Sequence, residues 1–339
     1  MCTDLRLVNL DGLHVSARTL DFAHELGSRV QVVPAGLEWS ATATETAAAT
    51  LAWTNTHGYV AMDAFGFDWG VCDGLNDAGL SIGTLWLPET DLPEVPPAAG
   101  AAPAVDLIHF GQWILGTCAT VQDVRAAFAG VQLWNAPVRR LWPDGRTMPE
   151  MVKPLLDFAF PMHLAVHDAQ GGDLVVEFLG GGAVFHDNPT GVLTNSPTFG
   201  WHLTNLRNYV NLTNAEARPR DLMGFKVTPT GNGSGLLGIP GDVTPPTRFV
   251  RATMLTTVTT TAKDAHAAVN EAFHCLDLVH VPRQVASSGD YTQWYVARDH
   301  DRLVYYVRSY DGWTTDAHDL HALGVADPKS SRRQFPLPA

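Results

Sequence analysis

Cysteine is scarce in this chain, and its spacing excludes the structures that cysteine-rich sequences form. The 339 residues contain four cysteines, Cys2, Cys72, Cys118 and Cys275. None belongs to a Cys-x-x-Cys pair and the spacings are wide, so neither a zinc ribbon nor a disulfide framework is indicated. The last three lie in apolar stretches, which is typical of buried core thiols. Cys2, directly after the initiator, is the exception.

Long apolar runs and a basic surplus are also lacking. No apolar run approaches the ~18 residues that a membrane helix requires, and no signal-peptide pattern precedes Cys2. We therefore expect a soluble, cytoplasmic protein, or a periplasmic or secreted one if a leader has been removed. The 22 basic residues against 35 acidic ones give a formal net charge of −13. Since a nucleic-acid-binding protein usually carries a basic stripe, we expect no nucleic-acid partner.

Two motifs that suggest metal or phosphate sites lack the context that such sites need. His163 and His167 would bind one metal ion together if they lay one turn apart on a helix. The alternation around them instead predicts a strand hairpin, on which they are about 13 Å apart. The glycine-rich run 231–238 lacks the Lys-Ser/Thr ending of a phosphate-binding loop. The sequence therefore indicates neither a metal ion nor an organic cofactor.

The order of the predicted elements favours antiparallel sheets flanked by helices. Strand-like segments dominate residues 2–86 and 163–185, and a closing hairpin is predicted at 292–308. Two helices are predicted within 105–128 and two more within 249–277. Because strands and helices do not alternate, a doubly wound parallel sheet is disfavoured. We expect an α+β fold that forms a single domain over residues 1–339.

The first two residues carry the strongest chemical signal. Cysteine has a small side chain, so an aminopeptidase can remove Met1 and leave Cys2 with both a thiol and a free α-amine. A free α-amine titrates near neutral pH and can accept the thiol proton. One residue would then supply both nucleophile and base. The alternative is that Cys2 is incidental and Met1 is retained.

A predicted hairpin gives Cys2 its neighbours. Asp11-Gly12 between two apolar-rich runs is typical of a two-residue type I′ turn. That turn would place Asp21 opposite Cys2, with Cβ atoms about 5 Å apart, where its carboxylate could hold the liberated ammonium group. In a regular ladder, Arg18 lies on the opposite face from Asp21. We therefore predict that the second strand bulges or ends near Arg18–Asp21, so that Arg18 reaches the same site.

Several short stretches occur in one order over nearly the whole chain. They are Met1-Cys2-Thr3, Ala17–Asp21, Asn76–Leu80, Val192–Phe199, Trp201–Leu206, Gly238–Asp242 and Thr247–Phe249. Together they resemble the choloylglycine hydrolase family of N-terminal-nucleophile (Ntn) hydrolases, which includes penicillin V acylases and conjugated bile salt hydrolases. Each stretch alone is a weak signal, whereas the ordered set is specific. The resemblance implies a four-layer αββα sandwich of two antiparallel sheets, the Ntn-hydrolase fold.

The resemblance also implies the chemistry and the residues that perform it. It implies hydrolysis of a non-peptide amide through an acyl-enzyme on Cys2, activated by Met1 removal or autoproteolysis. Carried over by position, Asp21 binds the α-amine of Cys2 and Arg18 lies beside the thiolate. Asn195 is the side-chain donor of the oxyanion hole, and Arg248 completes the polar network. Without the resemblance, the arginines would be interpreted as ordinary ion pairs and Asn195 as a turn residue.

One position departs from part of the family and points to the substrate. Many bile salt hydrolases have Asn, and some acylases Tyr, where this chain has Trp86. The second oxyanion donor there is expected to be the backbone N–H, which Trp86 retains. Tryptophan at this site is similar to the penicillin V acylase branch that also accepts N-acyl homoserine lactones. An apolar pocket for an aromatic or fatty acyl group is predicted from Tyr59, Met62, Phe65 and Phe67, which could equally be core residues.

The sequence is therefore interpreted as an N-terminal cysteine amidohydrolase of the penicillin V acylase type, with N-acyl homoserine lactones as a further substrate class. A conjugated bile salt hydrolase with the same chemistry is the alternative. From another class, an inactive scaffold could be anchored to a membrane through lipid on Cys2. The resemblance implies a homo-oligomer, a tetramer in many family members, and a small-molecule amide as the only other partner.

Overall fold

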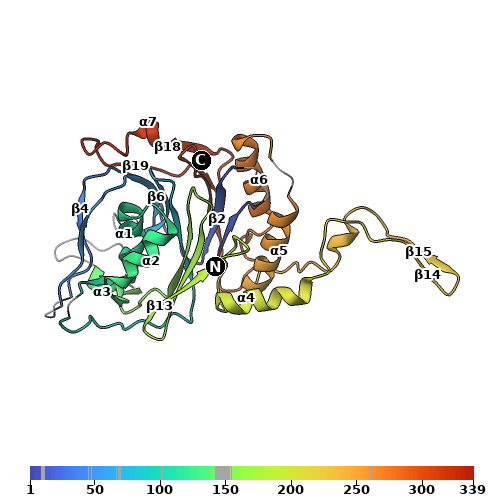
Figure 1. Ribbon diagram of the computed structural model, residues 1–339, viewed down its shortest axis with the longest axis horizontal. Coiled ribbons are helices and arrows are strands. Elements are labelled where there is room, and N and C mark those ends of the chain that lie inside the picture. The colour runs from blue at the N-terminus through green and yellow to red at the C-terminus, as the bar shows by residue number, and fades with distance from the viewer. Residues whose placement is uncertain are drawn as a thin grey trace.

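The computed structural model describes residues 1–339 except 9–11, 45, 47, 66, 68–69, 101, 142–152, 154 and 260–261. Two antiparallel sheets form its centre (Figure 1). The smaller sheet has the order β1-β2-β16-β17-β18. These strands are β1 Cys2–Arg6, β2 Val15–Phe22, β16 Tyr291–Asp299, β17 Val304–Ser309 and β18 Asp316–Asp319. The two ends of the chain thus meet in one sheet.

The larger sheet has the order β13-β12-β11-β8-β7-β6-β3-β19, and its pairs are all antiparallel. The strands on one side of its centre are β13 Gly182–Asp187, β12 Asp173–Leu179, β11 Met162–His167 and β8 Ser81–Trp86. Those on the other side are β7 Val71–Asn76, β6 Tyr59–Asp63, β3 Val30–Val33 and β19 Arg333–Phe335. The predicted hairpin that contains His163 and His167 is confirmed.

Helices cover the outer face of each sheet and complete four layers (Figure 1). The helices α5 Pro245–Val258 and α6 Ala265–Asp277 pack on the smaller sheet, and α1 Phe110–Thr117 packs on the larger one next to α2 Val121–Ala129. Local sequence sets their starts. Thr120 and Asp123 form a reciprocal capping box at α2, and the Asp264 side chain accepts from the Ala267 N–H at α6. The predicted αββα sandwich is confirmed.

Short elements connect the layers. They are β4 Glu38–Ser40, β5 Ala52–Thr54, β9 Ala104–Asp106, η1 Leu107–His109, β10 Gln132–Trp134, α3 Val138–Leu141, α4 Phe199–Asn205, η3 Leu206–Tyr209, η4 Ser234–Leu236 and α7 Leu320–Leu323. A two-stranded arm, β14 Arg220–Leu222 and β15 Phe225–Val227, projects far from the body (Figure 1). Among the described helices, none is long and apolar enough to cross a membrane.

The opening hairpin differs from its prediction in register. Cys2 pairs with Leu20, not with Asp21, and Arg6 pairs with Ser16. The partners' numbers therefore sum to an even value, which requires an odd number of residues in the connection and rules out a two-residue turn. Asp11 itself lies outside the described residues.

The sequence predicts that the second strand bulges or ends near Arg18–Asp21. β2 has no bulge there and ends at Phe22, and the irregularity lies in the neighbouring β16, between Thr292 and Trp294, opposite Asp21 and Leu20. The one-residue change in register explains why β2 needs no bulge. Cys2 and Arg18 now lie on the same face of the sheet, and Asp21 lies on the other.

Candidate active site

Cys2 lies at the edge of the smaller sheet, where a distant segment closes over it. Its side chain is buried at 5% exposure. β1 forms a bridge to residue 193, with Asp4 and Leu193 exchanging both backbone hydrogen bonds. That register brings Asn195 opposite Cys2, and the Cys2 backbone nitrogen donates to Asn195 Oδ1 at 2.7 Å. Because these residues are 193 positions apart in the sequence, local patterns do not predict this contact.

Arg18 reaches the sulfur from the neighbouring strand. Its Nη2 lies 3.4 Å from Cys2 Sγ, and the guanidinium also donates to the carbonyls of Cys72 and Thr84. Arg18 is fully buried. Burial alone would lower its pKa, but the Cys2 and Asp73 charges outweigh burial and raise the pKa above its ordinary value. The group is therefore a fixed cation aimed at the sulfur, where it can stabilise negative charge that develops during a reaction.

Asp21 lies behind Cys2, on the opposite face of the sheet from the sulfur. Its Oδ1 accepts from Thr292 Oγ1 at 2.5 Å, and its Oδ2 lies 3.8 Å from Arg248 Nη1. Oδ2 is buried and has no hydrogen-bond donor. An α-amine liberated at Cys2 would add donors to this region, so the unsatisfied oxygen fits the predicted contact, although the two residues are not cross-strand partners.

Arg248, on α5, forms hydrogen bonds with Cys2, Thr3 and Asn195. It donates through Nη1 to the Cys2 carbonyl and to Thr3 Oγ1, both at 2.5 Å, and through Nη2 to Asn195 Oδ1 at 2.9 Å. Burial lowers its pKa, and the nearby Asp21 and Cys2 charges partly offset that effect. The side chain bridges α5, β1 and the loop that contains Asn195, as the resemblance implies.

Asn195 and Trp86 meet beside the site, Asn195 from the segment that bridges to β1 and Trp86 from the end of β8 in the larger sheet. Asn195 Nδ2 donates to the Trp86 carbonyl at 2.8 Å, which leaves its second N–H available. The Leu87 N–H donates to Pro161 across the ladder. Since backbone groups alternate in direction along a strand, the Trp86 N–H is directed away from β11, to the side where Asn195 lies. Both predicted oxyanion donors therefore lie on one side of the site.

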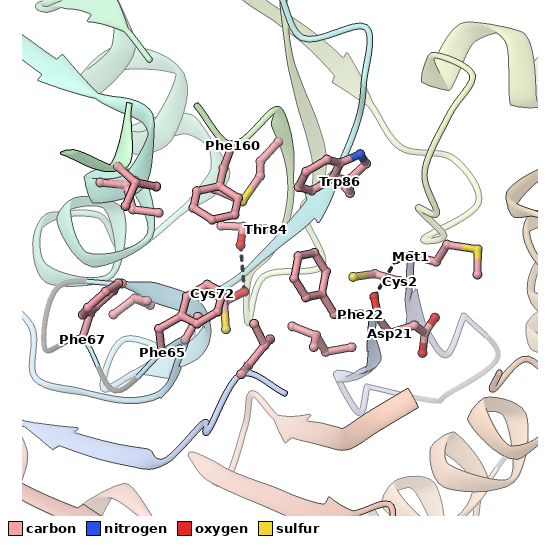
Figure 2. Close-up of a pocket in the computed structure, with 18 of the residues that line it drawn as sticks. Met1, Cys2, Asp21, Phe22, Phe65, Phe67, Cys72, Thr84, Trp86 and Phe160 are labelled. Carbon is pink, nitrogen blue, oxygen red and sulfur yellow. Dashed lines mark hydrogen bonds between the residues drawn. The ribbon is translucent and has the colours of Figure 1, made fainter. Parts of the chain in front are cut away.

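An apolar cavity opens beside Cys2 (Figure 2). Phe65, Phe67 and Trp86 line it, as predicted. Tyr59 and Met62 do not, and that expectation is corrected. Tyr59 is fully buried against the helical layer on the other face of β6, because side chains alternate along a strand. Met62 faces the space between the sheets but is fully buried within the core.

The sequence reading missed the aromatic residues that complete this cavity. Phe160 lines it, and the Trp86 ring stacks on Phe158 with ring centroids 5.5 Å apart. Phe22 packs against Trp86 from the opposite sheet, at 6.0 Å. Phe158 and Phe160 occur in a stretch without clear periodicity, so no local signal marked them. The result is an aromatic cluster around Trp86 at one side of the cavity.

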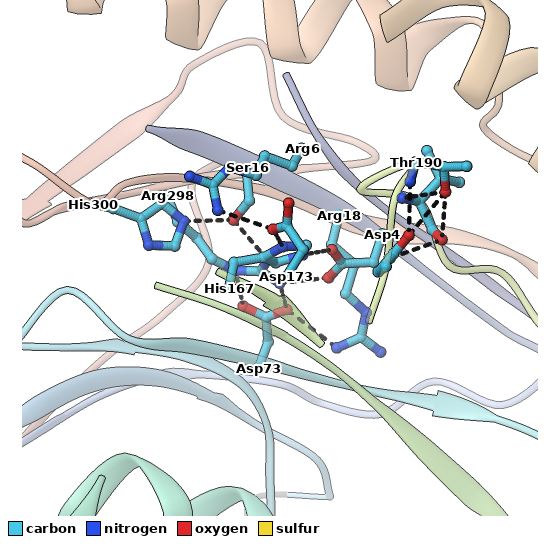
Figure 3. A network of polar contacts seen from close by, with 12 residues as sticks. Asp4, Arg6, Ser16, Arg18, Asp73, His167, Asp173, Thr190, Arg298 and His300 are labelled. Carbon is cyan, nitrogen blue, oxygen red and sulfur yellow. Dashed lines mark hydrogen bonds and ion pairs between the residues drawn. The ribbon is translucent and has the colours of Figure 1, made fainter. Parts of the chain in front are cut away.

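A buried charge network joins the two sheets next to Arg18 (Figure 3). Asp73 Oδ2 accepts from Arg18 Nη1 at 3.1 Å, and Oδ1 accepts from Arg298 Nε at 3.0 Å and from the Tyr305 hydroxyl at 2.8 Å. Arg298 in turn donates to Asp4 Oδ2 at 3.0 Å. All five side chains are fully buried. These residues come from five different strands, and no motif or spacing in the sequence predicts that they meet.

The paired histidines of β11 take part in ordinary polar contacts. His167 lies between Asp4 and Asp173, at 2.8 and 2.6 Å. His163 donates to the Thr194 carbonyl at 3.0 Å, directly before Asn195. Within the part of the chain that the structure describes, no group of three or more His, Cys, Asp or Glu residues is arranged to hold a metal ion.

Comparison with known proteins identifies the class of this site. Residues 2–330 match the family described as "Linear amide C-N hydrolases, choloylglycine hydrolase family". The chain belongs to this family. It is accordingly a hydrolase of C–N bonds in non-peptide amides.

Relatives within the family carry both of the activities considered above. The bile salt hydrolase/transferase of Clostridium perfringens is 27% identical over 326 residues, which cover 95% of this chain and 93% of that protein. The penicillin V acylase of Pectobacterium atrosepticum is 29% identical over 194 residues, covering 56% of this chain and 47% of that protein. Family membership therefore fixes the reaction class without selecting the acyl group.

Solved structures in the family share the fold. A conjugated bile acid hydrolase from Clostridium perfringens matches with a TM-score of 0.82 at 24% identity, covering 99% of this chain and 96% of that one. A penicillin V acylase from Agrobacterium tumefaciens matches with a TM-score of 0.77 at 22% identity, covering 99% and 91%. The predicted Ntn-hydrolase fold is confirmed.

Proposed function

We propose that Cys2, freed of Met1, is the nucleophile of an amidase that removes an apolar aromatic or fatty acyl group from an amine. The observation that carries this proposal is the convergence on Cys2 of Arg18 at its sulfur, Asn195 at its nitrogen and Arg248 at its carbonyl. These residues come from different elements and all are buried. A core cysteine needs no such set of charged partners.

The reaction follows from these positions. The Cys2 sulfur attacks the amide carbon, and the carbonyl oxygen takes the negative charge between Asn195 Nδ2 and the Trp86 N–H. The Cys2 α-ammonium gives its proton to the leaving nitrogen as the C–N bond breaks, and a thioester remains. Water then attacks the thioester, with the α-amine as base, and releases the acid. Arg18 stabilises the thiolate before each cycle.

The lining of the cavity supports a substrate of the penicillin V acylase type, and N-acyl homoserine lactones with apolar chains fit the same description. Among its described residues, the polar side chains lie next to Cys2. The Arg18 guanidinium is hydrogen-bonded and Thr84 donates to the Cys72 carbonyl at 3.2 Å, while the open Asp21 Oδ2 lies on the face of the sheet away from the sulfur. Burying a hydroxyl without a partner costs about 1–3 kcal/mol. A hydroxylated steroid acyl group, the alternative, would leave its hydroxyls unsatisfied here.

A substrate panel on the Met-free protein tests the proposal. Phenoxyacetyl and decanoyl amides should be hydrolysed faster than glycocholate, and Cys2→Ala should keep the fold but lose at least about a thousandfold in rate. Intact mass should show loss of Met1 and an unmodified Cys2. Lipid on Cys2 would favour the anchored scaffold, which the 5% exposure of this side chain already disfavours. Hydrolysis by Cys2→Ala at the wild-type rate would refute the mechanism.

We also propose that the protein is a homo-oligomer assembled through its arm. An isolated two-stranded hairpin is marginally stable in water, yet β14 and β15 project alone and expose Leu222, Met223, Phe225 and Val227 (Figure 1). A second copy could cover these side chains. Light scattering should report an oligomer that Met223→Asp with Phe225→Asp converts to monomer, whereas Val285→Asp, at another exposed apolar residue, leaves it intact.

A further inference from the structure

Met1 occupies a defined place at the end of β1. Its carbonyl accepts from the Asp21 N–H at 2.9 Å, and its ammonium nitrogen donates to the Asp21 carbonyl at 2.6 Å. The same nitrogen lies 3.2 Å from Asp290 Oδ1. Met1 also lines the cavity that contains Cys2, and Figure 2 shows it beside Cys2 and Asp21. The residue is therefore held like one further rung of the β1–β2 ladder.

Removal of Met1 changes the chemistry of this place. The Asp21 N–H and carbonyl lose their hydrogen-bond partners on Met1. Buried backbone groups without a partner are costly, so a ligand that replaces these hydrogen bonds is stabilised. Asp290, 17% exposed in its side chain, loses the cation that it faces. The vacated place is thus bordered by one backbone donor, one backbone acceptor and the Asp290 carboxylate, with the new α-ammonium of Cys2 at its inner end.

The vacated place is next to the atom that protonates the leaving group. Before removal, the Met1 carbonyl carbon is bonded to the Cys2 nitrogen. After removal, in the proposed mechanism, that nitrogen is the α-ammonium that donates its proton to the departing amine. The amine half of the substrate must therefore extend from the Cys2 nitrogen into the space that Met1 vacates. This step rests on the proposed function, because it requires Met1 removal and attack by Cys2.

We propose that this place, bordered by Asp21 and Asp290, binds the amine half of the substrate and selects a neutral α-amino carbonyl compound. An ester, lactone or amide carbonyl can accept from the Asp21 N–H, as the Met1 carbonyl does. A free α-carboxylate could accept the same bond but would bring a negative charge towards Asp290, and like charges that approach closely repel. The site therefore favours N-acyl α-amino amides, esters and lactones over N-acyl amino acids.

A matched pair of substrates isolates this charge effect. N-decanoylglycinamide and N-decanoylglycine share the acyl group and the scissile amide and differ in the charge of the terminal group. With the Met-free protein, kcat/KM should be at least about fivefold larger for the glycinamide. In Asp290→Asn the ratio should fall towards one, through a gain on the glycine substrate. Asp187→Asn, at an exposed carboxylate on β13, should leave the ratio unchanged.

The possible failures are distinguishable. Equal kcat/KM values for the two substrates, or an unchanged ratio in Asp290→Asn, would overturn this inference and leave the proposed function intact. If neither substrate is hydrolysed although iodoacetamide labels Cys2, the proposed function fails and the inference fails with it. Glycinamide itself should inhibit hydrolysis of a phenoxyacetyl amide competitively, and more strongly than glycine does. This second measurement does not depend on hydrolysis of either decanoyl substrate.

Discussion

Arg18 and Cys2 lie on adjacent strands with Nη2 3.4 Å from Sγ, because the β1–β2 register pairs Cys2 with Leu20 and so puts both side chains on one face. The contact couples a sheet register to an electrostatic effect. A guanidinium at this distance favours the charged form of a thiol, provided that both groups are shielded from water. Both are buried, so the effect should be measurable in the reactivity of Cys2.

Arg18→Met should make Cys2 less reactive at neutral pH. Loss of the cation removes a group that stabilises negative charge on the sulfur, so iodoacetamide alkylation at pH 7 should slow, and amide hydrolysis at pH 7 should fall about a hundredfold. The rates of both reactions in wild type and variant provide the check. Arg18→Lys, which keeps the charge, should recover part of the alkylation rate. An unchanged alkylation rate in Arg18→Met would show that the contact has no electrostatic role.

Asp73→Asn should destabilise the protein far more than Tyr305→Phe. Asp73 accepts from both Arg18 and Arg298, so losing its charge leaves two buried guanidinium groups with one carboxylate fewer, at a cost of about 3–5 kcal/mol. The Tyr305 hydroxyl donates one hydrogen bond to the same carboxylate, worth about 1.5 kcal/mol because the acceptor is charged, and its removal leaves both arginine contacts in place. Urea unfolding of both variants measures the difference. Equal effects would contradict the role of Asp73 as the centre of the network.

The sequence predicted the features that neighbouring residues determine and failed where a feature depends on exact register or on distant contacts. The helix pairs, the β11–β12 hairpin and the absence of strand–helix alternation depend on local periodicity, and they predict antiparallel sheets flanked by helices. The four-layer αββα order came from the family resemblance. The Cys2–Asp21 pairing failed because it depended on one turn length, and a single residue more or less in a turn inverts every face. The placement of Tyr59 failed for the same reason: its strand was clear but its face was not.

The proposed catalytic set came from the family resemblance, since local patterns could not join Arg18, Asn195 and Arg248. Their meeting depends on the bridge between β1 and residue 193 and on the packing of α5. Asp73, Arg298, Phe158 and Asp290 were not identified because neither spacing nor motif marks them. That residues 1–339 form a single domain, and that Cys2 is the nucleophile, stay predictions.

Asn195→Ala should lower kcat with little change in KM. The free N–H of Asn195 Nδ2 would meet charge that develops only in the transition state, and loss of one such donor costs about a hundred- to a thousandfold in rate. Steady-state kinetics on a decanoyl amide, with thermal unfolding to confirm the fold, give the measurement. Rapid alkylation of Cys2 should persist, because Arg18 is unchanged. A rise in KM at constant kcat would instead assign Asn195 to ground-state binding.

Asp4 should make the fold sensitive to acid. Burial would raise the pKa of this carboxyl, but Arg298 and His167 outweigh burial and lower the pKa from 3.8 to about 2. A carboxyl with a depressed folded-state pKa stabilises the fold fully above its unfolded pKa, and the contribution disappears as pH falls through the folded value. About 2 kcal/mol should therefore be lost between pH 4 and pH 2. Urea unfolding of wild type and Asp4→Asn should show a stability difference that is constant from pH 7 to pH 4 and shrinks below it, whereas Asp187→Asn, at an exposed carboxylate, should match wild type throughout. A difference that does not change with pH would mean that Asp4 acts through packing, with its charge making no contribution.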